Sequence, residues 1–189
     1  RQRLFHGGPY LPLRRQSDFL NACINNERWA QKKLYEDNYA SMMSLSMRYA
    51  NNNDDALDIL HESFIKIFRN LHKYQSGTSI AAWIRKIVIN TAIDFYRRDL
   101  KRKSEDLNEA NYITTGIPDA ISTISSEEIL KALQQLPHSY RSVFNLHVIE
   151  GYSHKEIAEM LNINESTCRS NLVKARTKLK NILLAADSD

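Results

Sequence analysis

The spacing of apolar residues along most of the chain is that of helices. Apolar positions recur every three or four residues over long stretches, without a convincing alternation typical of strands. Five glycines and four prolines in 189 residues provide few turn signals and favour long helices. The pattern predicts an all-α protein. Its first helices are expected from the cap Ser17, from about Glu27 to Tyr49, from Asp54 and Asp55, and from about Ile80 to past Arg98.

The periodicity breaks after the fourth predicted helix. Residues 104–125 are polar, contain Gly116 and Pro118, and lack sustained spacing, which indicates a linker. The sequence therefore predicts two small helical domains joined by a flexible linker. The predicted divisions are a flexible N-terminal extension at 1–16, a first domain at 17–100, the linker at 101–125 and a second domain at 126–186. Helices are expected in the second domain from about Glu127 to Leu136, from Tyr140 to Ile149 and on both sides of a turn at Asn162.

Residues 152–179 have the signals of a helix-turn-helix, beginning with Ser153 and Glu156 in the spacing of a capping box. Asn162 stands where the chain turns, and asparagine tolerates the left-handed backbone conformation that such a turn needs. In the second helix Cys168 belongs to an apolar stripe, while the opposite face is polar and cationic. Such a face suits the major groove of DNA, although similar faces also occur as ordinary solvated surface. It carries Ser166, Arg169, Ser170, Lys174 and Thr177.

Positive charge is concentrated in two parts of the chain. The formal net charge is +4 and the isoelectric point is about 9.0, so the protein is mildly basic. Lysine and arginine gather between residues 85 and 103, and again between residues 169 and 180. Two separate basic clusters predict two separate contacts with a polyanion such as nucleic acid.

The sequence shows no pattern of catalytic or metal-binding residues. Its two cysteines, Cys23 and Cys168, are far apart and each lies on an apolar helical face, as small core residues do. No Ser/His/Asp or Cys/His grouping and no glycine-rich phosphate loop occurs. We therefore expect no enzyme activity, no cofactor and no metal ion. With no apolar run of membrane-spanning length and no secretory signal, the expected location is the cytoplasm.

Three segments carry more specific information. They are DALDILHESFIKIF at 55–68, WIRKIVINTAIDFYRR at 83–98, and LPHSYRSVFNLHVIEGYSHKEIAEMLNINESTCRSNLVKARTKL at 136–179. In sequence, order and spacing they resemble a bacterial RNA polymerase sigma factor of the sigma-70 family, in its extracytoplasmic-function (ECF) group. The first segment is similar to the family's core-polymerase-binding helix, and the second to the helix that binds the promoter −10 element. The third is similar to the domain that reads the −35 element.

The resemblance implies a subunit that joins core RNA polymerase, directs it to promoters and helps to open the duplex, without a catalytic site of its own. The implied polymerase-binding residues are Asp58, His61, Glu62 and Lys66, although the family commonly has glutamine where this chain has His61. The −10 candidates are Tyr74, Ser76, Thr78, Ser79, Arg85, Lys86, Asn90, Arg97 and Arg98. The −35 candidates are Ser166, Thr167, Arg169, Ser170, Lys174 and Arg176.

Residue chemistry suggests roles for several candidates. Tyr74 and the hydroxyl side chains after it would line a pocket for an unpaired base, since stacking on an aromatic ring contributes about 1–3 kcal/mol per base. Asn90 offers both a donor and an acceptor, and matches an asparagine often found there in the family. We expect Arg169 to be the main base reader, because arginine to guanine is the commonest specific contact. Lys174 and Arg176 are expected to bind phosphate.

Two other functions stay open on the sequence alone. An ordinary helix-turn-helix regulator would bind DNA without docking on polymerase, and residues 17–100 would then form a dimerisation domain. A sigma-like subunit would instead leave the choice of promoter to another DNA-targeting partner. An anti-sigma factor is a further potential partner by resemblance. The acidic part of the linker either lies in the polymerase or serves as a passive tether.

Overall fold

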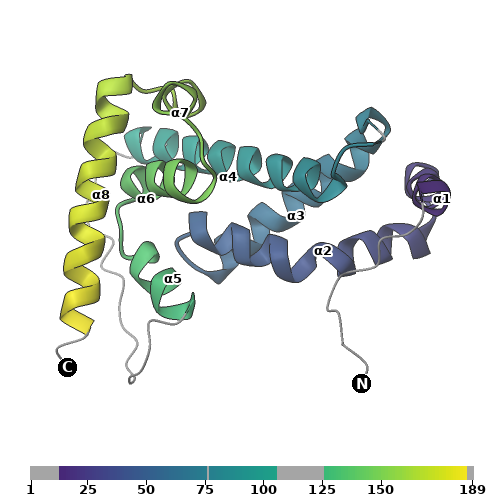
Figure 1. The fold of residues 1–189 in the computed structure, drawn as a ribbon, viewed down its shortest axis with the longest axis horizontal. Coiled ribbons are helices and arrows are strands. Elements are labelled where there is room, and N and C mark those ends of the chain that lie inside the picture. Colours follow the sequence, from purple (N-terminus) through teal and green to yellow (C-terminus); the bar gives the residue numbers. More distant parts are fainter. Residues whose placement is uncertain (1–12, 76, 106–125, 187–189) are drawn as a thin grey trace, which may run out of the picture.

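The computed structural model describes residues 13–75, 77–105 and 126–186, and their elements are all helical, which confirms the predicted all-α class (Figure 1). The elements before residue 106 form what we name the N-terminal half. They are α1 (Leu13–Ile24), α2 (Arg28–Tyr49), α3 (Asn53–Asn70), η1 (Leu71–Lys73) and α4 (Ile80–Glu105). Those after residue 125 form the C-terminal half. They are α5 (Ser126–Gln134), α6 (His138–Phe144), η2 (Asn145–Ile149), α7 (His154–Leu161) and α8 (Glu165–Ala186).

Local signals account for most of the helix boundaries in the N-terminal half. The side chain of Asn52 caps α3 by accepting a hydrogen bond from the backbone N–H of Asp55 at 2.8 Å. Asn26, with a φ of 62°, supplies the left-handed turn between α1 and α2, where the sequence predicts a break. Helix α1 begins at Leu13 rather than at Ser17, because the leucine, arginine and glutamine residues before Ser17 favour helix more strongly than serine does.

Two further boundaries differ from the prediction. Helix α4 continues to Glu105, so the predicted linker at 101–125 begins with helix, and its remaining part at 106–125 lies outside the described residues. The lysines and arginine at its start are good helix formers, which favours this extension. The helix predicted from Tyr140 to Ile149 is divided into α6 and the wider π-type turn η2. It ends before Gly151, which has a φ of 78°.

The N-terminal half is built around α2, α3 and α4. Helix α3 packs between its two long neighbours, and α1 covers α2 at the far end of the molecule (Figure 1). On each helix the apolar residues recur every three or four positions, so they form one stripe that faces the core. The fully buried residues of this core include Leu45, Ile59, Leu60, Ile67, Ile84 and Val88.

The C-terminal half packs directly against the N-terminal half. The core that surrounds Leu60 continues without interruption into Val143, Leu146, Ile157 and Cys168 of the C-terminal half. Helix α6 packs on α2, and α7 packs on α4. A second, smaller cluster joins α5 to the middle and end of α8 through Leu133, Ala175 and their neighbours. The sequence predicted two bodies connected by a tether, and the contact between the halves is a feature it did not predict.

Candidate nucleic-acid and protein interfaces

Helices α7 and α8 form the helix-turn-helix that the sequence predicts. The Glu156 carboxylate accepts a hydrogen bond from the backbone N–H of Ser153 at 2.8 Å, while Ser153 Oγ accepts one from the backbone N–H of Glu156 at 3.3 Å. This reciprocal pair is the predicted capping box. Asn162 ends α7 in the left-handed conformation with a φ of 53°. Ile157 and Cys168 are buried between the two helices, so their angle is fixed by packing.

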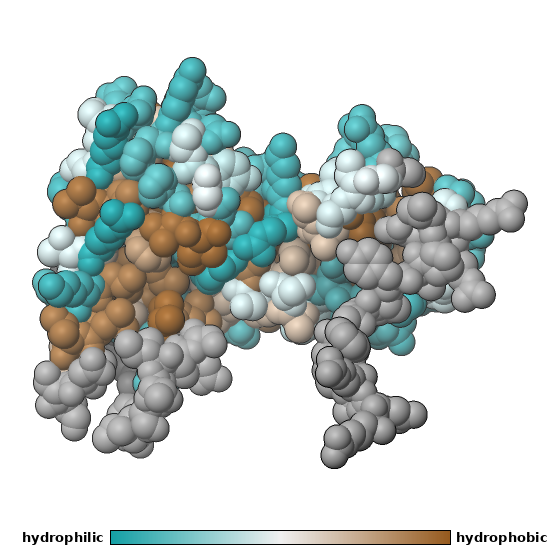
Figure 2. All heavy atoms as spheres, in the orientation of Figure 1, coloured by the Kyte–Doolittle hydropathy of each residue, from teal (hydrophilic) through white to brown (hydrophobic). Residues whose placement is uncertain are grey.

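The outer face of α8 leaves its predicted DNA-binding residues open to solvent. Arg169 pairs with Glu165 one turn earlier, and this hydrogen bond raises the pKa of Arg169 and lowers that of Glu165. Figure 2 shows hydrophilic side chains gathered over α7 and the adjoining end of α8, and an apolar area toward α5. The exposed candidates are Ser166, Thr167, Arg169, Ser170, Lys174 and Arg176.

One further residue of this face, Val173, is not among the predicted −35 residues. Val173 is 63% exposed although it is apolar, and it follows Arg169 and Ser170 at helical spacing. An exposed aliphatic side chain beside basic and hydroxyl groups suits contact with the methyl group of thymine. The same spacing in the sequence was the signal that could have identified Val173.

His147 of η2 stacks on His154 at the start of α7, and this pair predicts a dependence of stability on pH. His154 Nδ1 lies 3.4 Å from Cys168 Sγ, and its ring stacks on that of His147 with 4.3 Å between centroids. Burial, followed by the nearby His147, lowers the pKa of His154 below its ordinary value of 6.5. The unfolded chain therefore binds a proton at His154 more readily than the folded chain does.

Neutral His154 contributes to the free energy of unfolding, and we expect this contribution to be fully present above pH 6.5. The free energy of unfolding should fall as the pH drops through 6.5 toward the lower pKa of folded His154. Urea titrations across this pH window test the expectation, together with an NMR titration of the His154 ring. In His154→Gln this part of the pH dependence should be missing. An NMR midpoint at or above 6.5 in the folded protein would contradict the expectation.

Helix α4 carries the predicted −10 residues on more than one side. Lys86, Asn90 and Arg97 are exposed and share one stripe at helical spacing. Before the helix, the Tyr74 hydroxyl donates to the carbonyl of Thr78, and the Tyr74 ring meets Trp83 edge-on with centroids 5.8 Å apart. These contacts hold an aromatic ring and two exposed hydroxyl side chains, Thr78 and Ser79, beside the stripe, while Ser76 lies outside the described residues.

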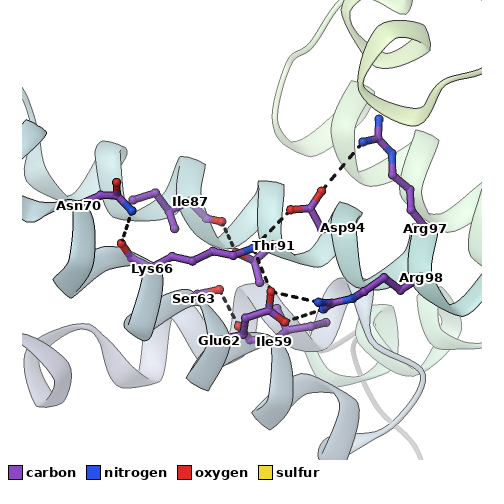
Figure 3. A network of polar contacts seen from close by, with 10 residues as sticks. All are labelled: Ile59, Glu62, Ser63, Lys66, Asn70, Ile87, Thr91, Asp94, Arg97 and Arg98. Carbon is purple, nitrogen blue, oxygen red and sulfur yellow. Dashed lines mark hydrogen bonds and ion pairs between the residues drawn. The ribbon is translucent and has the colours of Figure 1, made fainter.

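Several predicted polymerase-binding and −10 residues belong to a single polar network between α3 and α4 (Figure 3). The Arg98 guanidinium donates to both oxygens of Glu62, and this hydrogen bond lowers the pKa of Glu62. Lys66 Nζ lies 3.0 Å from Glu62 and 3.3 Å from Asp94. Glu62 and Lys66 therefore lean toward α4, and the two predicted surfaces are joined by these contacts.

The outward stripe of α3 also contains an apolar residue that is not among the predicted polymerase-binding residues. Asp58, His61, Ile65 and Arg69 are exposed and follow one another at helical spacing. Ile65 is 51% exposed and lies in the middle of this stripe. An apolar centre with charged residues around it is the usual composition of a protein–protein interface. The position of Ile65 between His61 and Arg69 in the sequence was sufficient to find it.

Two of the predicted −10 arginines contact the C-terminal half. Arg85 donates to the Glu150 carboxylate through Nε at 2.8 Å and through Nη2 at 2.6 Å. Arg48 Nη2 lies 3.1 Å from the same carboxylate. Arg97 donates to the backbone carbonyl of Met160. The C-terminal half thus contacts guanidinium groups that the sequence assigns to DNA.

Neither a metal site nor a membrane-spanning element occurs in the described part of the chain. Within residues 13–75, 77–105 and 126–186, no three histidine, cysteine, aspartate or glutamate residues are grouped as potential metal ligands. No helix in the same ranges is long and apolar enough to cross a membrane.

Comparison with known proteins connects these surfaces to a family. Residues 34–102 match the family Sigma-70 region 2, and residues 126–179 match Sigma-70, region 4. The RNA polymerase sigma factor SigV of Bacillus subtilis (strain 168) is 31% identical over 151 residues, which cover 80% of this chain and 89% of SigV. The ECF RNA polymerase sigma factor SigE of Mycolicibacterium smegmatis is 32% identical over 151 residues, covering 77% of this chain and 58% of SigE.

The fold is also shared with a solved structure. The sigma factor RpoE from Bartonella quintana, determined in complex with the anti-sigma factor NepR, aligns with a TM-score of 0.52 and 20% identity, over 80% of this chain and 95% of RpoE. The two matched regions include α3, most of α2 and α4, and the helix-turn-helix as far as residue 179 of α8. The chain belongs to the sigma-70 family of RNA polymerase sigma factors, in its extracytoplasmic-function group.

Proposed function

We propose that this sigma factor binds core RNA polymerase through the outer stripe of α3, the −10 element through α4 with the loop before it, and the −35 element through the first turns of α8. The observation that carries this proposal is the separation of three exposed surfaces of different chemistry on a single helical scaffold. The protein acts without a catalytic centre, and it works in the cytoplasm, where core polymerase and the chromosome are found. Its promoter specificity is the choice of the DNA site at which it places the polymerase.

The surface on α4 suits DNA that is being opened. Lys86 and Arg97 supply positive charge for phosphates, and Asn90 between them supplies a donor and an acceptor for a base edge. The Tyr74 ring lies next to this stripe and supports stacking of an unpaired base. Capture of unpaired bases favours the melted state of the duplex, because the same surface has no matching partner in intact double-stranded DNA.

The surface on α8 suits intact duplex. The capping box and the left-handed Asn162 hold the two helices so that the N-terminal turns of α8 project outward. Arg169 is positioned by Glu165, which restricts a long side chain before it meets a base. Glu165 thereby serves as a positioning residue for the arginine that we assign to base reading. Lys174 and Arg176 lie further along the helix, where phosphate contacts fix orientation.

Replacing Arg169 by alanine should lower transcription from a cognate promoter by roughly tenfold to 100-fold, because a bidentate contact to guanine contributes about 1–3 kcal/mol of discrimination. Run-off transcription with core polymerase and the purified chain measures this effect, with promoters identified by sequencing 5′ transcript ends after overexpression. Lys178→Ala is the matched control, since Lys178 is an exposed cation of the same helix to which we assign no base contact. Equal selectivity of both variants would exclude Arg169 as the base reader.

A further inference from the structure

The turn that leads into α4 is closed on itself by hydrogen bonds. The carbonyl of Gln75 accepts from the backbone N–H of Thr78 at 3.4 Å and from Thr78 Oγ1 at 2.9 Å. Gly77, with a φ of 96°, supplies the positive φ that the chain needs between these two residues. Ser79 caps α4, because its Oγ accepts from the backbone N–H of Ala82 at 3.3 Å. We name Gln75, Gly77, Thr78 and Ser79 the entry turn.

Tyr74 connects the entry turn to the main core. Its ring packs against that core and contacts the ring of Trp83, with 5.8 Å between centroids and 65° between the ring planes. Its hydroxyl reaches the other side of the turn, where it donates to the carbonyl of Thr78. A turn that is bonded to a side chain anchored in the core loses conformational freedom before any ligand binds. The Tyr74 hydroxyl therefore restricts the positions that the entry turn can adopt.

The same hydrogen bonds determine which groups the entry turn offers to a ligand. A hydroxyl group donates one hydrogen bond and accepts up to two. Exposed Thr78 donates its proton to Gln75, so its hydroxyl oxygen can only accept from a ligand. Exposed Ser79 accepts from the backbone of α4, so its proton is available to donate. An acceptor and a donor on consecutive residues suit the edge of an unpaired base, which also presents donors and acceptors next to each other.

We propose that Tyr74 is a positioning residue, whose hydroxyl holds the entry turn so that Thr78 and Ser79 meet an unpaired −10 base in a fixed arrangement. The proposal rests on the assignment of this loop to −10 DNA in the proposed function. It gives the two ends of Tyr74 separate roles. The ring supports stacking, which tolerates every base, whereas the hydroxyl orients the groups that distinguish one base from another. The substitution Tyr74→Phe keeps the first role and removes the second.

Competition binding by the holoenzyme, reconstituted from core polymerase and the full chain, tests the proposal. The probes are single-stranded oligonucleotides with the non-template −10 sequence of a promoter mapped by 5′ transcript ends, and each position carries each of the four bases in turn. The unmodified protein should prefer one base at one position or more. In Tyr74→Phe the preference at one such position should fall by about fivefold, because its hydrogen-bonding groups are no longer fixed in advance. Tyr74→Ala should in addition bind every probe about tenfold more weakly, because the stacking surface is lost.

Tyr39→Phe is the matched control, because Tyr39 is a partly exposed tyrosine of α2 to which we assign no contact with DNA or polymerase. It removes the same hydroxyl group and should leave every base preference unchanged. If the Tyr74 hydroxyl acts through the entry turn, the double variant Tyr74→Phe/Ser79→Ala should lose no more preference than Ser79→Ala alone. The NMR order parameter of the Thr78 amide should be lower in Tyr74→Phe than in the unmodified chain, a change that a role in stacking alone would not produce.

Failure of the positioning role and failure of the DNA assignment give different results. Unchanged base preferences in Tyr74→Phe, or an unchanged order parameter of Thr78, would overturn the positioning role. Equal weakening of all probes by Tyr74→Phe would overturn it as well, because the hydroxyl would then serve the fold or a backbone contact. If Tyr74→Ala binds every probe as tightly as the unmodified protein, or the unmodified protein prefers no base, the assignment of the entry turn to reading of −10 DNA is overturned instead.

Discussion

Replacing Ile65 by glutamate should lower promoter-specific transcription by the reconstituted holoenzyme by about 100-fold, which corresponds to about 2.7 kcal/mol of binding free energy. Ile65 lies in the middle of the α3 stripe that we assign to core polymerase. Binding residues near the centre of an interface contribute most of its energy, because they are fully desolvated in the complex. A carboxylate at that position would be buried without an assigned partner and would oppose association.

The fold itself should tolerate this change. Ile65 is half exposed, and the neighbouring positions Ser63, Phe64 and Ile67 supply the buried face of α3. The loss of transcription should therefore match the loss of affinity for core polymerase. This affinity is measured by letting the variant compete with a labelled unmodified chain for core polymerase. Thermal unfolding of the isolated variant should stay close to that of the unmodified chain, since surface substitutions commonly alter stability by less than about 0.5 kcal/mol.

Ile24→Glu is the matched control, because Ile24 is 38% exposed at the end of α1 and lies outside the α3 stripe. It introduces the same charge in place of the same side chain and should leave affinity for core polymerase unchanged. Full affinity of Ile65→Glu for core polymerase would show that the outer face of α3 is not the docking surface. A loss of affinity in Ile24→Glu as large as in Ile65→Glu would point to the added charge rather than to the position.

The helix-turn-helix could be predicted because its signals are local. Ser153 and Glu156 form the capping box from positions three residues apart, and Asn162 sets the turn through its own backbone conformation. Burial of Cys168 follows from the spacing of apolar residues along α8. The exposed cationic face of α8 is the consequence of that spacing, so its candidates were found together.

The packing of the halves could not be predicted in the same way. Glu150 pairs with Arg85 across 65 positions, and neither residue has a local signal that names the other. One indirect signal was present in the sequence of α4, where the apolar residues Val88 and Ile89 are neighbours. Both are buried in the structure. A helix that packs on one side only shows a single apolar stripe, so buried neighbours indicate a second partner. That pattern indicates a contact but does not identify the element that makes it.

Arginines are the residues for which the sequence is least informative. A cluster of basic residues predicts contact with a polyanion, but it does not distinguish an arginine that is free from one that is already paired. Arg85 and Arg98 were both assigned to DNA, and the structure pairs them with Glu150 and Glu62. Arg141 was not assigned any role, although it is among the most deeply buried side chains of the described residues.

Replacing Arg141 by alanine should lower the free energy of unfolding of the chain by about 3 kcal/mol. The residue is 1% exposed, and burial lowers the pKa of its guanidinium to about 10, so the group stays charged at neutral pH. Alanine would leave the Ala50 carbonyl without its donor in a buried position, which costs about 1–3 kcal/mol. The space left by the long side chain adds a cavity term to this loss.

Urea unfolding followed by circular dichroism measures the effect, with Arg176→Ala as a control at an exposed position of α8. Arg141→Met should lose less than alanine does, because methionine fills the space of the arginine stem while still removing the hydrogen bonds. Residues of the contact between the halves belong to the core that runs through both of them. Loosening this contact should therefore also make unfolding less cooperative, which appears as a shallower unfolding transition. If Arg141→Ala and the unmodified chain unfold at the same urea concentration, the halves are not held together in solution by this contact.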